Sequence, residues 1–132
     1  PFLSFLVNNS GSISIPPPPS SGTPVTLKWE TQNIQPGTCK GQSSAPSTYS
    51  TWNGPLSGTS GTTKTVSPDN PDTEIVTIPS SAAGTITFRL KGCKGIDTTN
   101  LGDRTVTVTI ATTATSTGSG TSISPVKPWE EF

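Results

Sequence analysis

The chain has 132 residues, 28% of them hydrophobic and 12% charged, and its 8 Lys and Arg residues balance its 8 Asp and Glu residues. This length fits one domain of ordinary size, and the sparse, balanced charge excludes a basic stripe that neutralises phosphates, so we expect no nucleic-acid partner. The sequence also lacks histidine, the commonest general base and metal ligand at neutral pH, so we expect no enzymatic activity, no metal site and no cofactor.

Residues 1–19 combine an apolar strand with a proline spacer. Large apolar residues fill the start of this segment: Phe2, Leu3, Phe5, Leu6 and Val7. Residues 12–15 alternate serine and isoleucine, as a half-buried strand does. Pro16–Pro19 cannot donate to a β-ladder, so we expect the strand to end there. Because the chain begins at Pro1 and not at Met, we expect that a leader is removed or that the chain is a fragment of a longer one.

The clearest strand of the first half covers residues 24–31. Its apolar residues share one face: Val25, Leu27 and Trp29. A turn follows at residues 33–37. Residues 40–62 are rich in Gly, Ser, Thr and Pro, so we expect a loop or a poorly regular strand there, anchored in the core by Trp52.

The second half contains four further strand patterns. A short edge strand is predicted over residues 62–67, and a second strand over residues 74–78. Two longer runs, residues 86–91 and 105–110, alternate apolar and polar side chains. The apolar faces of these last three runs are formed by Val76 and Ile78, by Ile86, Phe88 and Leu90, and by Val106, Val108 and Ile110.

No window has an apolar period of 3.6 residues, so we expect almost no helix. About seven short strands separated by turns predict an all-β, two-sheet antiparallel sandwich. Strict alternation after residue 90 would place Gly92, and not Cys93, on the apolar face. We therefore predict a β-bulge near Gly92 that turns Cys93 inward.

The two cysteines, Cys39 and Cys93, are separated by several strand patterns. In a Ser- and Thr-rich, charge-poor chain of this kind they favour a disulfide and an extracellular or cell-surface location. The alternative is a pair of buried free thiols in a cytosolic protein. After Ile110 the sequence becomes a Thr-, Ser- and Gly-rich linker, and residues 112–132 form a tail that carries Trp129 and Phe132.

Residues 22–31, GTPVTLKWET, closely resemble the second strand of immunoglobulin-like modules in prokaryotic surface proteins. The rest of that pattern is present as Cys39, Trp52-Asn53-Gly54, residues 64–68, residues 85–90, Cys93 and residues 105–110. This resemblance covers residues 20–111 and implies an immunoglobulin-like domain with a structural or adhesive role and no catalysis. The chain departs from the pattern in its long loop at residues 40–62 and in its second cysteine, which is displaced by one position.

Three small candidate sites have ordinary alternative explanations. The oxygen donors Asp69, Asn70, Asp72 and Glu74 could hold Ca²⁺, but a polar turn explains them and their spacing matches no calcium-loop motif, so we predict no metal here. Tyr49 could bind a glycan if it is exposed. Asn8 begins the pattern Asn-Asn-Ser and could be glycosylated.

The apolar segment Phe2–Val7 has three explanations. It is the end of a preceding domain or membrane segment, an extra strand of its own sandwich, or a strand donated to a neighbouring copy. We expect the third. The predicted function is a structural subunit or module of a prokaryotic surface filament, pilus or adhesin, assembled through terminal strands. The predicted partners are other copies of the chain or adjacent modules, and the predicted assembly residues are Phe2, Leu3, Phe5, Leu6, Val7, Trp129 and Phe132. The alternative is a carbohydrate-binding accessory domain of a secreted protein, which recognises a host or surface glycan.

Overall fold

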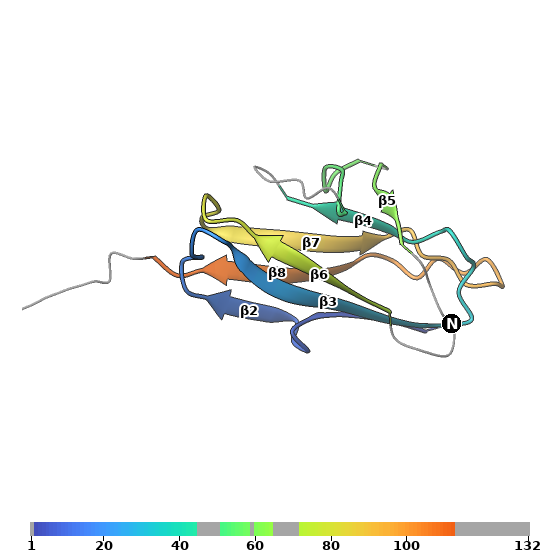
Figure 1. Ribbon diagram of the computed structural model, residues 1–132. Helices are drawn as coiled ribbons and strands as arrows, with labels where there is room; N and C mark the ends of the chain where they lie inside the picture. The colour runs from blue at the N-terminus through green and yellow to red at the C-terminus, as the bar shows by residue number, and fades with distance from the viewer. Residues whose placement is uncertain (1, 45–50, 59, 65–71, 113–132) are drawn as a thin grey trace, which may run out of the picture.

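A computed structural model describes residues 2–44, 51–58, 60–64 and 72–112. Eight strands form in these residues, and no helix does. The strands are β1 (Phe2–Val7), β2 (Ser12–Ile15), β3 (Thr23–Gln32), β4 (Lys40–Ser43), β5 (Thr62–Thr63), β6 (Asp72–Ile78), β7 (Thr85–Lys91) and β8 (Arg104–Ile110) (Figure 1).

The strands form two sheets. One has the order β1-β3-β6, and the other has the order β2-β8-β7-β4-β5. Neighbouring strands are antiparallel, except that β2 runs parallel to β8. The predicted all-β, two-sheet sandwich is therefore confirmed, with eight strands in the described residues where about seven were expected.

The core lies between the two sheets, where the alternating apolar faces meet. All three predicted faces of the second half are buried, and so are Val25, Leu27 and Trp29 of β3. Trp52 is fully buried, which confirms its prediction as a core anchor. Its ring stacks on Phe5 with a centroid distance of 5.3 Å and meets Trp29 and Phe88 edge-on at 5.8 and 6.1 Å.

Residues 2–15 belong to this same sandwich. β1 pairs with β3 in one sheet, the chain changes sheets at residues 8–11, and β2 pairs with β8 in the other sheet. Of the three explanations for the apolar segment, this chain by itself shows the second, an extra strand of its own sandwich. The sequence boundary at residue 19 thus does not coincide with a break in the fold.

One local expectation is narrowed and one is wrong. Residues 40–43, expected as a loop or a poorly regular strand, form β4, whose inward positions are Gly41 and Ser43. No apolar alternation marks this strand because the Trp52 ring, and not a side chain of β4, fills the space at Gly41. The expected bulge is absent: β7 ends at Lys91, and Gly92 turns the chain with φ of 76°. The inward position of Cys93 is confirmed, since its side chain is fully buried.

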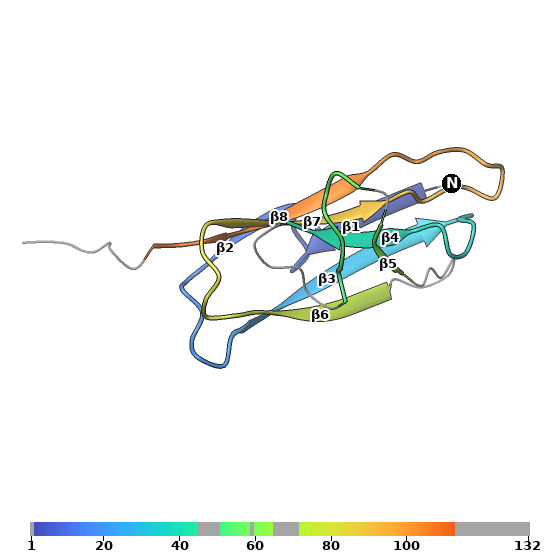
Figure 2. The same cartoon turned by 90° about the horizontal axis from the view of Figure 1, so that it is seen from above.

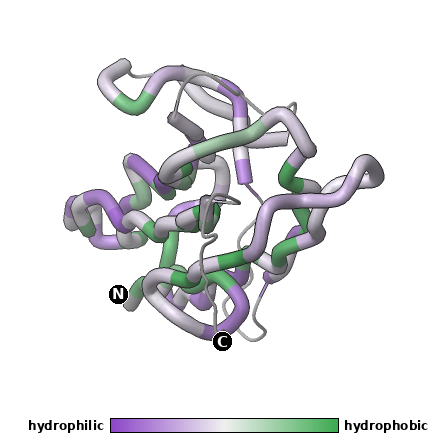
Figure 3. Tube along the Cα trace, turned by 90° about the vertical axis from the view of Figure 1, so that its left-hand side faces the viewer, coloured by the Kyte–Doolittle hydropathy of each residue, from purple (hydrophilic) through white to green (hydrophobic). Residues whose placement is uncertain are grey.

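The sandwich is elongated along its strands. β1 begins at one end of the long axis, beside the β7–β8 loop, and β8 ends at the opposite end (Figures 1 and 2). Figure 3 looks along this axis and shows hydrophobic and hydrophilic residues alternating along the strands. The two ends of the described chain therefore leave the sandwich in opposite directions.

Candidate functional site

The predicted assembly strand β1 lies at the edge of the three-stranded sheet, where its only sheet partner among the described residues is β3. Leu3, Phe5 and Val7 point into the core and are 7%, 5% and 0% exposed. Leu6 is half-buried on the outer face. The backbone of Phe2 pairs with Gln32, and its side chain is not described. Apolar residues of β1 thus complete the core of their own chain.

A tight turn at Asn8 and Asn9 follows β1. Both residues have positive φ, 46° and 64°, a conformation in which asparagine is enriched among non-glycine residues. The Asn8 side-chain oxygen accepts a hydrogen bond from the backbone N–H of Thr26 at 2.8 Å, and the Asn8 N–H donates to the Thr26 carbonyl at 2.8 Å. Asn8 is exposed, so its side chain is accessible. Its glycosylation stays a prediction.

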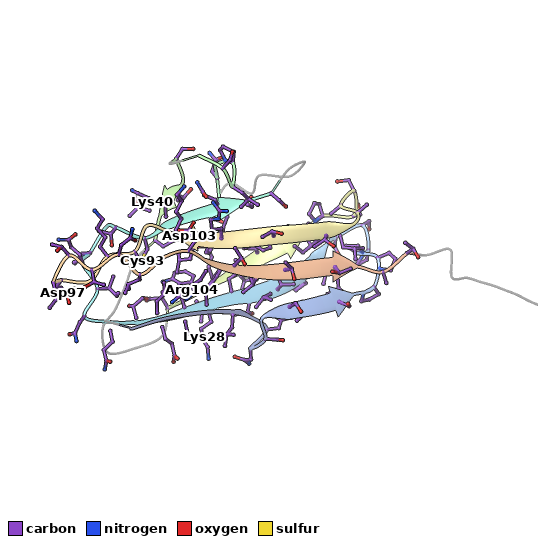
Figure 4. The ribbon with its side chains drawn as sticks, turned by 180° about the vertical axis from the view of Figure 1, so that it is seen from behind. Lys28, Lys40, Cys93, Asp97, Asp103 and Arg104 are labelled. Atoms are coloured by element: carbon purple, nitrogen blue, oxygen red, sulfur yellow. A yellow bond between two sulfur atoms is a disulfide. The ribbon has the colours of Figure 1, made fainter. Side chains whose placement is uncertain are left out.

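The predicted disulfide joins Cys39 and Cys93, and it contains both cysteines of the chain. It links the segment before β4 to the segment after β7, next to the end at which β1 begins (Figure 4). A disulfide in a small all-β domain is compatible with an extracellular location.

A charged cluster lies on one side of the sandwich, between β5 and β6. Lys64, 4% exposed, forms a 2.8 Å ion pair with Glu74, donates to the Thr51 carbonyl and lies 4.3 Å from the Trp52 ring centroid. Burial lowers the pKa of Lys64, while the hydrogen bond and the charge of Glu74 act in the opposite direction. This lysine could not be singled out from the sequence, because a single Lys after a Thr-rich run has no distinguishing spacing.

A cavity of about 350 Å³ adjoins this cluster. Trp29, Lys64, Asp72 and Glu74 line it together with four threonines. One carboxylate oxygen each of Asp72 and Glu74 is buried without a hydrogen-bond partner among the described residues. The segment 65–71, which includes Asp69 and Asn70 of the calcium hypothesis, lies outside the described residues. Within the described ranges, no three potential metal ligands come together.

Neither tryptophan near this cavity forms an exposed platform for a sugar ring, because Trp29 is 3% and Trp52 is 0% exposed. Tyr49, on which the carbohydrate-binding alternative depends, lies outside the described residues. Trp129 and Phe132, the lesser assembly candidates, also lie outside them.

A covering segment, which runs from Trp52 to β5, lies on the outer face of the sheet that contains β4 and β7. Polar side chains of these two strands bind it there. Gln42 donates to the carbonyls of Gly58 and Ser60, Arg89 donates to Leu56, and Lys91 donates to Gly58. Gln42 is fully buried by this covering segment. Donor groups of Gln42, Arg89 and Lys91 on that outer face thus bond to backbone carbonyls of the covering segment.

The ends of the long axis differ in shape. At one end, the β7–β8 loop carries Ile96, which is 65% exposed, and Asp97, whose pKa is lowered by hydrogen bonds from Thr99 (Figure 4). At the other end, an apolar cavity of about 260 Å³ opens between Pro17, residues 82–84 and residues 110–112. Only the tertiary structure brings these three segments together.

No protein-family model, curated protein or solved structure matches this chain. Within the described residues, no helix has the length and apolar character needed to cross a membrane.

Proposed function

We propose that this chain is a structural module of a prokaryotic cell-surface filament, pilus or adhesin, in which neighbouring copies follow one another along the long axis. The observation that carries the proposal is the position of the two ends: β1 begins at one end of the sandwich and β8 ends at the other (Figures 1 and 2). Modules linked through such ends extend in one direction, as a filament or a surface stalk requires.

Terminal-strand exchange is the proposed means of assembly. β1 is an edge strand, so within the described part of the chain it can leave its sheet by breaking its pairing with β3 alone. The place of β1 beside β3, where Phe5 stacks on Trp52, is called the β1 groove, and every copy would have the same one. A β1 donated by a neighbour would fill that groove with the same contacts.

The extracellular location is part of the proposal. It is supported by the disulfide between Cys39 and Cys93 and by a surface with few charges. We assign no reaction to the module. Lys64, its least exposed charged side chain among the described residues, is held in an ion pair with Glu74.

Deleting residues 1–10 tests the assembly mechanism. The shortened chain lacks the buried side chains Leu3, Phe5 and Val7, each of which contributes about 1–3 kcal/mol through burial. We expect it to form no polymers and to unfold at a markedly lower denaturant concentration than the full chain. A synthetic peptide of residues 1–10 should restore its stability, measured by urea unfolding.

Two variant peptides test which face of the peptide strand contacts the core. Phe5→Asp places a charge against Trp52, so that peptide should not restore stability, whereas a Leu6→Ser peptide changes the opposite face of the strand and should do so. Electron micrographs that show the shortened chain assembling like the full one would disprove strand exchange.

A further inference from the structure

Asn53 is the only asparagine of the chain that is followed by a glycine. It comes directly after Trp52, at the start of the covering segment, and its side chain is exposed. Gly54 adopts a φ of 129°, in the region that favours glycine. Because residue 54 has no side chain, its backbone nitrogen can approach the side-chain carbonyl carbon of Asn53 without obstruction from a Cβ.

The two groups that would react have no hydrogen bond to other described residues. Neither the side-chain amide of Asn53 nor the Gly54 N–H has a partner among them. By contrast, the side-chain oxygen of Asn8 is held by the Thr26 N–H at 2.8 Å. The side chain of Asn53 can therefore turn toward the backbone of the next residue without breaking a hydrogen bond of its own.

Ser43 of β4 holds the backbone on both sides of Asn53. Its hydroxyl donates to the Trp52 carbonyl at 2.7 Å, and its N–H donates to the Gly54 carbonyl at 3.4 Å. The second bond is long, and hydrogen bonds weaken toward this distance. Bringing the Gly54 nitrogen to the side chain of Asn53 thus breaks the weaker bond and leaves the bond to Trp52 intact.

We propose that Asn53 is a site of spontaneous deamidation. The Gly54 backbone nitrogen gives its proton to solvent and forms a bond to the side-chain carbonyl carbon of Asn53. The bond from that carbon to the side-chain nitrogen breaks, and the nitrogen takes up a proton and leaves as ammonia. Water then opens the cyclic succinimide at one of its two carbonyls, which gives aspartate or isoaspartate. Water is the only co-reactant, and no side chain is required as a catalyst.

The isoaspartate product changes the path of the main chain, which then runs through the former side chain of residue 53. An additional backbone atom separates Trp52 from Gly54, so the two carbonyls no longer have the spacing at which Ser43 binds both. Gly54 is buried, and a Cβ added to it would lie 3.0 Å from the Ser60 carbonyl oxygen, so little space is left for a longer chain. The modification therefore loosens the backbone that carries Trp52 into the core.

Ageing the folded, full-length protein at mildly alkaline pH tests the site. We expect the peptide that contains Asn53 to gain the mass of an NH-to-O exchange several-fold faster than the peptides that contain Asn8, Asn33 or Asn100. In water labelled with heavy oxygen, the product should carry the label, which distinguishes ring opening during ageing from aspartate already present. The matched control is Asn53→Gln, because the longer side chain closes the corresponding ring far more slowly. Conversion at Asn53 no faster than at the other asparagines would overturn the proposal.

Urea unfolding of the aged protein tests the structural effect. The isoaspartate form, separated by ion exchange and identified by fragmentation mass spectrometry, should unfold at a lower urea concentration than the unaged protein. Asn53→Asp adds the same charge but keeps the normal backbone, so its urea midpoint should stay close to that of the native chain. Equal losses of stability in the two would show that charge, and not chain length, is the cause, and the loosening of Trp52 would be wrong. Neither measurement involves a second copy of the chain, so failure here leaves the proposed assembly standing.

Discussion

Trp52 determines how the residues around it can pack. The indole lies over Gly41 of β4, and a Cβ added to Gly41 would come within 2.5 Å of both a Trp52 ring carbon and the Lys64 side chain. Glycine within a strand often marks such a close approach. The core on this side is therefore built from one large side chain facing a strand that offers no apolar side chain of its own.

Gly41→Ala should destabilise the protein by about 1–3 kcal/mol, because the buried indole has to shift to admit the methyl group. The matched control is Gly11→Ala, where an added Cβ meets nothing within 4 Å and φ is not positive. We expect the control to change the unfolding free energy by less than about 0.5 kcal/mol, measured by urea unfolding. Equal effects of the two variants would contradict the close packing at Gly41.

The burial of Lys64 gives stability a dependence on pH, which its ion pair with Glu74 reduces. Burial holds the pKa of folded Lys64 below the ordinary lysine value of about 10.4, which it regains on unfolding. Between these two values the unfolded chain binds the proton and the folded chain does not. The contribution of Lys64 to the unfolding free energy therefore rises with pH across this window and is lost as pH falls through the folded pKa.

Glu74→Gln removes the hydrogen-bonded charge that raises the pKa of Lys64, so the folded pKa should fall further and the window should widen toward neutral pH. At neutral pH the variant leaves a buried ammonium without its counter-ion, and we expect a loss of about 2–3 kcal/mol. Urea unfolding from about pH 7 to about pH 10 measures both effects. Glu30→Gln, at an exposed position of β3, should keep the wild-type pH profile; a Glu74→Gln profile parallel to wild type would refute the assigned cause.

At the scale of elements, the disulfide links two connections between strands and not the strands themselves. Cys39 and Cys93 both lie outside the named strands, so the bond joins the β3–β4 and β7–β8 connections. Backbone hydrogen bonds reinforce this junction, including one from Gln35 to the Lys94 carbonyl at 2.7 Å. The end of the molecule that carries Ile96 is thereby tied to the sandwich.

Replacing both cysteines by alanine should lower the unfolding free energy by about 4 kcal/mol, the chain-entropy estimate for a closed loop of this length. The matched comparison is the native chain unfolded with and without a reductant. If reduction leaves the urea midpoint of the native chain unchanged, the bond does not constrain the unfolded state as expected.

The proposed strand exchange would give β1 two roles with one pattern. Its alternation of buried Leu3, Phe5 and Val7 with outward side chains fits its own sandwich, and in the proposed exchange it would fit the same position in a neighbour. The pattern predicted the strand but left its acceptor open, because the proposed acceptor would present the same edge of β3 as the chain itself. The peptide experiment with residues 1–10 addresses this element.

At the scale of the whole molecule, the long axis organises the proposed function. β1 begins beside the loop that carries Ile96, and β8 ends beside the apolar cavity (Figures 1 and 2). One end thus carries the start of β1, the strand of the proposed exchange, and the other carries the cavity.

The strands that could be predicted are those whose own apolar side chains on one face are buried in the core. The alternation in β3, β7 and β8 predicted their buried faces, because period-2 burial leaves a direct mark on the sequence. The bounds of β4 could not be predicted, because Gly41 is covered by Trp52 from a separate segment and the strand has no apolar alternation. The Lys64–Glu74 pair could not be predicted either, since Lys64 follows β5 of one sheet and Glu74 lies in β6 of the other.

The sequence by itself determined the fold class and its strongest strands, because local alternation requires a sheet with one buried face. It also favoured the pairing of Cys39 with Cys93, since both follow strand patterns in a charge-poor, Ser- and Thr-rich chain. Only the tertiary structure decided that Leu3, Phe5 and Val7 complete their own core and that the β7–β8 loop and the apolar cavity lie at opposite ends. These features depend on which distant segments meet, and no local pattern encodes that meeting.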